Sequence, residues 1–80
     1  MSRAGRPPAT DLFDELAQGI AAGRTLRDVA EELGITYRQA SIRMRNLRQE
    51  LVRETNDAAW LDRTNVQVAL GWLEHRGIER

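Results

Sequence analysis

Residues 25–51, which read TLRDVAEELGITYRQASIRMRNLRQEL, decide the fold of this chain. Two threonines in this stretch each precede, by three residues, a side chain that can accept a hydrogen bond from the threonine's own backbone N–H. The pairs are Thr25 with Asp28 and Thr36 with Gln39. This spacing is typical of the capping box, in which the two residues satisfy each other's backbone N–H groups where a helix begins. The stretch therefore predicts two helix starts, eleven residues apart.

A turn of three residues, Gly34-Ile35-Thr36, separates the two predicted helices. Glycine readily adopts the left-handed conformation that ends a helix, and Ile35 is placed to fill the angle between the helices. The second helix is expected to run from Tyr37 to a point between Leu51 and Thr55. Each helix keeps its apolar residues on one face: Leu26, Val29, Ala30 and Leu33 in the first, and Ala40, Met44, Leu47 and Leu51 in the second. Two short helices joined by such a turn form a helix-turn-helix.

Further helices are predicted on both sides of this motif. The first begins at Thr10 or Asp11 and ends at about Ala22, before a glycine. The last runs from about Thr64 to Arg76 and begins with a third Thr-x-x-Gln pattern. The inward faces are expected to hold Leu12, Phe13, Leu16 and Ile20 in the first helix, and Val66, Ala69, Leu70 and Leu73 in the last.

The remaining segments are expected to be loops and an arm. Asn56–Asp57 is predicted to be a loop. The residues between Leu51 and Arg63 are expected either to extend the preceding helix to Thr55 or to form an extra turn at Ala58–Leu61. Residues 1–9 contain no periodic apolar positions and are predicted to be a flexible, disordered basic arm. Residues 10–80 are predicted to form one all-α, four-helix domain.

The composition favours a cytoplasmic protein without catalytic machinery. None of the 80 residues is cysteine, which excludes a disulfide framework and a zinc finger of the usual type. The apolar runs are far shorter than the about 20 residues of a membrane span, and no secretory leader opens the chain. The single histidine, His75, is expected to be exposed. We therefore expect no enzymatic activity, metal, cofactor or membrane contact.

Charge is unevenly distributed along the chain, although the formal net charge is zero. Residues 35–53 carry five arginines and one acid, whereas residues 9–34 carry six acids and two arginines. A local excess of positive charge matters more to a phosphate backbone than the total does. Every basic residue is arginine, whose planar fork suits both phosphate and guanine. This distribution indicates that the second helix of the motif contacts a nucleic acid.

The candidate DNA-binding residues lie on the face of that helix opposite its buried stripe. They are Arg38, Ser41, Ile42, Arg45, Arg48 and Gln49, with Arg43 and Arg53 beside them. In the major groove, arginine reads guanine and isoleucine touches the thymine methyl group, and the cap at Thr36 leaves backbone N–H groups for a phosphate. We expect sequence-specific binding of double-stranded DNA. Two alternatives stay open: the arginines pair with Asp28, Glu31 and Glu32, or the motif is an adaptor that docks on RNA polymerase, a sigma factor or another regulator.

Most of the chain resembles the DNA-binding domain of the LuxR/GerE family, although its helix-turn-helix core also resembles region 4 of sigma factors. The likeness is carried by Ile20-Ala21-Ala22-Gly23, Val29-Ala30-Glu31-Glu32-Leu33-Gly34-Ile35-Thr36, Gln39-Ala40, Leu47 to Leu51, and Arg63-Thr64 to Gly77-Ile78. It implies a stand-alone transcriptional regulator of GerE type. Base contacts are then expected from Ser41, Ile42 and Arg45, and backbone contacts mainly from Arg38, Gln39, Arg43 and Arg48. The chain departs from the family where Arg43 replaces a frequent His and where the Leu51–Arg63 connection is longer.

The resemblance also implies a homodimer, because the last helix of the family pairs two subunits. Val68 and Trp72 are four residues apart and form a second apolar edge of that helix. We expect this edge to be exposed and to form the dimer interface. The alternative is that Trp72 folds back onto Trp60 or onto the first helix.

The N-terminal arm holds a second candidate DNA contact. Its stretch Arg3-Ala4-Gly5-Arg6-Pro7-Pro8 looks like a degraded AT-hook, in which Arg3 and Arg6 would enter a narrow minor groove. A disordered tail with two arginines is the alternative. The expected location is the nucleoid of a bacterium or of a cell that carries a phage.

Overall fold

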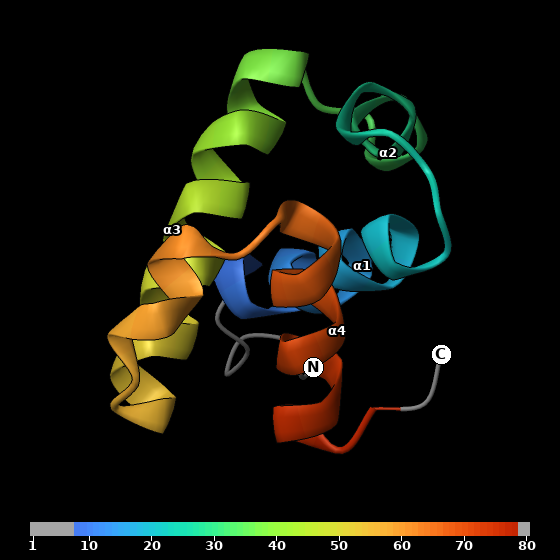
Figure 1. Cartoon of the computed structure of the whole chain (residues 1–80). Coiled ribbons are helices and arrows are strands. Elements are labelled where there is room, and N and C mark those ends of the chain that lie inside the picture. The colour runs from blue at the N-terminus through green and yellow to red at the C-terminus, as the bar shows by residue number, and fades with distance from the viewer. Residues whose placement is uncertain (1–7, 79–80) are drawn as a thin grey trace, which may run out of the picture.

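The computed structural model describes the backbone of residues 8–78 and the side chains of residues 12–78 (Figure 1). Its elements are α1 (Pro8–Ala21), α2 (Leu26–Leu33), α3 (Tyr37–Thr55), the 3₁₀ helix η2 (Ala58–Asp62) and α4 (Asn65–Arg76). No strand occurs in this part of the chain, which confirms the prediction of an all-α fold with four α-helices. Arg3 and Arg6 lie outside the described residues. None of the described helices is long and apolar enough to cross a membrane.

The helices pack as two pairs around one core. α4 lies against α1, and α2 lies against α3 to form the helix-turn-helix, while α3 also contacts α1 and α4 (Figure 1). η2, in orange, runs back along the C-terminal half of α3, so the long connection between α3 and α4 folds onto α3 (Figure 1). η2 therefore covers one side of α3 in its C-terminal half only. On the same side, the N-terminal half of α3 is not covered by η2.

Hydrogen bonds at the helix starts follow the threonine spacing of the sequence. Thr25, Thr36 and Thr64 each accept a hydrogen bond from the backbone N–H three residues later, at 3.0 to 3.2 Å. The last two form complete capping boxes with glutamine. The Asp28 side chain does not return the bond in the described structure, because aspartate is one methylene shorter than the residues that usually do.

The predicted start of α1, at Thr10 or Asp11, is two or three residues too late. The helix begins at Pro8, so Thr10 and Asp11 lie inside it. Residues 1–7 of the expected arm lie outside the described residues. Proline fits the first turn of a helix because its fixed φ is helical and its missing N–H needs no partner there.

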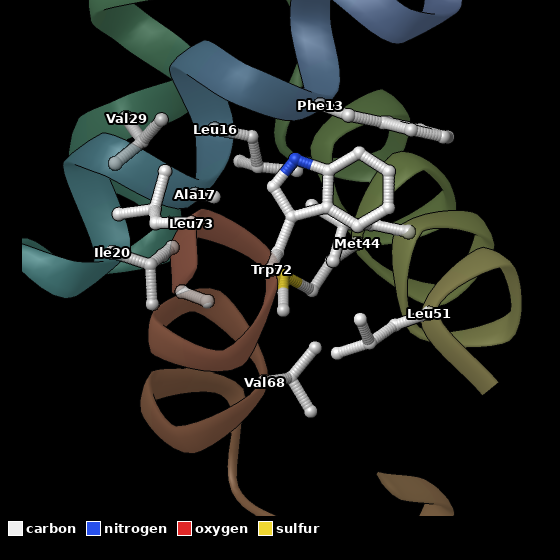
Figure 2. Packing of buried hydrophobic residues seen from close by; sticks show 12 residues of the cluster. Phe13, Leu16, Ala17, Ile20, Val29, Met44, Leu51, Val68, Trp72 and Leu73 are labelled. Carbon is white, nitrogen blue, oxygen red and sulfur yellow. The ribbon is translucent and has the colours of Figure 1, made fainter. Parts of the chain in front are cut away.

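The core lies where α1, α3 and α4 meet (Figure 2). Its large members are leucine, isoleucine, valine, methionine and two aromatic rings, Phe13 and Trp72, whose centroids lie 5.6 Å apart in an edge-to-face arrangement. The indole Nε1 of Trp72 donates a hydrogen bond of 2.9 Å to Oδ1 of Asp14, which satisfies its polar atom. The predicted stripe of α3 is confirmed, because Ala40, Met44, Leu47 and Leu51 are all buried.

The predicted inner face of α4 is partly wrong. Val66 is 45% exposed, whereas Val68 and Trp72 have 0% and 1% of their surface exposed. The indole of Trp60 lies against Gly71, so α4 presents Val68 and Trp72 to α1 and α3 instead of to solvent. The expected dimer interface at Val68 and Trp72 is therefore wrong, since neither residue has surface left for a partner. The alternative that Trp72 folds back onto the first helix is confirmed.

Candidate nucleic-acid interface

The exposed face of α3 lies opposite the core stripe, as the spacing of the apolar residues requires. Arg38, Ile42, Arg45 and Gln49 are exposed and follow one another at intervals of four, three and four residues. Ile42 is a large apolar side chain, yet 42% of its surface is exposed. These four residues form one row, which we call the reading row.

The arginines of the reading row have no carboxylate partner among the described side chains. Nearby acids bind other residues: Glu32 pairs with Arg24, Glu50 pairs with Arg53 at 2.5 Å, and Glu54 binds His75 at 2.9 Å. The alternative in which α2 acids neutralise the arginines of α3 is not observed in this part of the chain. A field of positive charge therefore remains along the N-terminal half of α3.

Thr36 and Gln39 were both candidate DNA contacts, and both serve first to begin α3. Gln39 N–H donates to Oγ1 of Thr36, and Thr36 N–H donates to Oε1 of Gln39, each at 3.0 Å. Both side chains stay exposed. The cap fixes the direction in which α3 leaves the turn, and hence the direction of the reading row.

Tyr37 was not among the predicted contacts, although it lies at the exposed start of α3. The guanidinium of Arg27 in α2 lies 4.8 Å from the centroid of its ring, a stacking distance for a cation–π pair. This pair joins the exposed ends of the two helices of the motif. Sequence reasoning missed it because Arg27 and Tyr37 are ten residues apart and belong to different helices.

The expectation that Arg48 is free for a DNA phosphate is wrong. Its guanidinium is half-buried and donates to the carbonyl oxygens of Trp60 at 2.9 Å and Arg63 at 2.5 Å, and to Oδ1 of Asn65 at 2.5 Å. Arg48 therefore holds η2 and the start of α4 against α3. Its acceptors lie 12 to 17 residues further along the chain, so local spacing in the sequence did not indicate them.

Two other predicted contacts, Ser41 and Arg43, are half-buried. The Nε atom of Arg43 is buried and has no hydrogen-bond partner in the described structure. Both residues therefore have less accessible surface than the reading row. Ser41 lies on the side of α3 that faces Leu61 of η2.

A groove of about 520 Å³ runs beside the reading row. Its lining comes from α3, from Leu26 of α2, from Leu61 of η2 and from Asn65 of α4; the α3 residues are Tyr37, Ser41, Met44, Arg45, Arg48 and Gln49. Arg45 and Gln49 belong both to the reading row and to the groove. The lining includes two arginines and no carboxylate.

At the C-terminal end of α3, Glu50 accepts a hydrogen bond of 2.5 Å from Nη2 of Arg53. This bond holds the pKa of Glu50 below its ordinary value of 4.5. No cluster of three or more possible metal ligands was found among the described residues.

A comparison of the chain with family models, with curated proteins and with solved structures found no match. The resemblance of residues 25–51 to the LuxR/GerE family therefore stays a prediction from the residues themselves.

Proposed function

We propose that this chain binds double-stranded DNA in a sequence-specific manner and regulates transcription, with the N-terminal half of α3 in the major groove. One observation carries the proposal: Arg38 and Arg45 stand exposed on either side of Ile42, with no carboxylate partner among the described side chains. Exposed positive charge that no carboxylate compensates attracts a polyanion such as the phosphate backbone of DNA. An apolar side chain between two arginines suits the mixed surface of base edges.

The residues of the reading row take different roles in this proposal. Arg45 reads a guanine through a bidentate bond, and Ile42 contacts a thymine methyl group. Arg38, near the start of the helix, contacts a phosphate and fixes the register. Arg48 makes no direct contact, because its donors are bound to η2 and Asn65.

The proposal does not need a dimer through α4. A single chain presents one reading helix and suits one half-site, whereas a palindromic operator requires a second copy joined through a face other than Val68 and Trp72. As a DNA-binding regulator, the chain belongs in the nucleoid of a bacterium or of a cell that carries a phage.

Selection of bound sites from random duplex DNA tests this proposal. The wild-type chain is expected to enrich a short motif that contains guanine opposite Arg45, and Arg45→Ala is expected to lose the preference at that one position. Enrichment of no motif by the wild type, or an unchanged motif with Arg45→Ala, would contradict sequence-specific reading by α3.

A second function, an adaptor that docks on RNA polymerase or a sigma factor, is favoured by a different observation. Tyr37, Ile42 and Leu61 are large hydrophobic residues that stay exposed near the groove, and exposed apolar side chains gather at protein-binding surfaces. The adaptor predicts little affinity for duplex DNA at any salt concentration. It also predicts that Ile42→Glu abolishes co-purification with RNA polymerase while DNA is absent.

A further inference from the structure

We infer that the groove between α3 and η2 receives one sugar-phosphate strand of the duplex, so that η2 is a second DNA-binding wall beside the reading helix. The inference rests on the proposed function, because it names how the same surface holds its DNA. It assigns a role to the Leu51–Arg63 connection, which lies outside the helix-turn-helix itself.

The chemistry of the lining fits a nucleic-acid backbone. Leu26, Tyr37 and Leu61 offer apolar surface, on which the C–H groups of a deoxyribose can pack. Ser41, Gln49 and Asn65 offer hydrogen-bond donors, of the kind that phosphates accept in protein–DNA complexes. No carboxylate lines the groove, so a polyanion in it touches no negatively charged side chain of the lining. Asp62, which follows Leu61 in the chain, is not part of the lining.

Arg48 supplies positive charge to the groove without taking part in an ion pair. Its three acceptors are two carbonyl oxygens and an amide oxygen, which are all neutral. Hydrogen bonds to neutral acceptors hold the guanidinium in place but leave its charge uncompensated. Asn65 gives its Oδ1 to Arg48, so its amide donors are the groups left for a ligand.

The position of the groove indicates which strand it receives. Arg45 and Gln49 line it and also belong to the reading row with Ile42. A helix that fills the major groove has a sugar-phosphate strand on each side. The strand on the η2 side then lies between Tyr37 and Leu61, and α3 forms the floor beneath it.

Introducing a charge at Leu61 tests this inference, because this side chain is 53% exposed and lines the groove from outside α3. Each phosphate contact contributes about 0.9 to the slope of log affinity against log salt concentration. One contact therefore raises the affinity at 0.1 M salt about tenfold over its value at 1 M. Leu61→Glu is expected to weaken binding about tenfold for every duplex sequence and to flatten the slope by about 1. Leu61→Lys is expected to strengthen binding several-fold and to steepen the slope.

Two controls accompany these variants, all measured by fluorescence anisotropy on the 80-residue chain. Leu61→Gln adds polarity without charge, and Val66→Glu adds the same charge at a nearby residue that is 45% exposed and does not line the groove. Both controls are expected to stay within about twofold of the wild type, which is the range of ordinary surface changes. Ethylation of phosphates should interfere on the strand that faces η2.

Three results would overturn the inference. Each of them can be distinguished from a failure of the proposed function. If the wild type binds duplex DNA but Leu61→Glu and Leu61→Lys match it, the groove is empty and DNA reading by α3 stands. Equal losses with Leu61→Glu and Val66→Glu would mean that only the overall charge matters. A dimer in sedimentation that Leu61→Glu dissociates without DNA would place a second copy in the groove. A wild type without duplex affinity removes both proposals together.

Discussion

The guanidinium of Arg48 in α3 donates a hydrogen bond of 2.9 Å to the carbonyl oxygen of Trp60 in η2. The same Nη1 atom reaches the carbonyl of Arg63, and Nη2 reaches Asn65. One side chain thus satisfies two carbonyl groups of the connection and fixes where α4 begins. Arg48 is therefore a basic residue of the predicted DNA-binding helix that stabilises the fold, because it ties η2 and the start of α4 to α3.

Arg48→Met should lower the free energy of unfolding by about 1–3 kcal/mol, because the carbonyl of Trp60 is partly buried and loses its donor. Arg45→Met is the matched control, since Arg45 is exposed on the same helix and should change stability by less than about 0.5 kcal/mol. Urea unfolding followed by circular dichroism measures both. Equal stability of the two variants would show that Arg48 does not hold the connection.

Trp72→Ala should lower the free energy of unfolding by about 3–5 kcal/mol, since it removes a buried ring from the core. It also removes the contact with Phe13 and the hydrogen bond to Asp14. Val66→Ala should cost less than about 0.5 kcal/mol, as expected for a surface residue. A greater loss with Val66→Ala, again in urea unfolding, would mean that α4 turns its other face to the core.

Gly71→Ala should destabilise the chain by about 1–3 kcal/mol, although alanine is normally the better helix former. A Cβ atom at this position would overlap the six-membered ring of Trp60. That ring cannot swing away freely, because its Nε1 donates a hydrogen bond of 3.1 Å to Thr55. In a Trp60→Leu background the same change should cost much less, and thermal unfolding of the four chains measures this coupling. Stabilisation by Gly71→Ala alone would contradict the packing of η2 on α4.

Glu50 should make stability weakly dependent on pH in the acid range. Its pKa in the folded chain lies below the ordinary value of 4.5, chiefly because Arg53 donates a hydrogen bond to it. A carboxyl whose folded pKa is lowered stabilises the fold fully above its unfolded pKa, and this contribution is lost as the pH falls through the folded value. Glu50→Gln should therefore reduce stability at pH 7 by a few tenths of a kcal/mol and converge with the wild type below pH 4.5. A constant difference between the two chains from neutral to acid pH would exclude this pair as the cause.

The features that depend on neighbouring residues were predictable from the sequence. The threonine caps, the glycine ends and the core stripe of α3 each follow from spacings within one helix, and the structure has them in place. The all-α fold follows from the same signals. The exposed row of Arg38, Ile42 and Arg45 was predictable too, because it is the opposite face of the stripe.

The features that depend on distant residues were not predictable in this way. The face that α4 turns inward is set by Trp60 against Gly71 and by Phe13 against Trp72, whereas the spacing within α4 favoured the edge that begins at Val66. The role of Arg48 depends on acceptors in a connection whose path no local pattern indicates. Its charge and its place on the face opposite the core stripe therefore put Arg48 with the predicted DNA contacts.

The affinity of the chain for a duplex, measured against salt concentration, tests the central claim most directly. The wild type should lose affinity steeply between low and physiological salt, as a phosphate-binding protein does. Arg45→Ala should weaken the selected site by about 1–3 kcal/mol and lower its preference over other sequences, whereas Arg53→Ala, at the far end of α3 and paired with Glu50, should leave that preference unchanged. A wild type whose weak binding hardly varies with salt, or equal effects of the two arginine variants on sequence preference, would contradict DNA reading by the N-terminal half of α3.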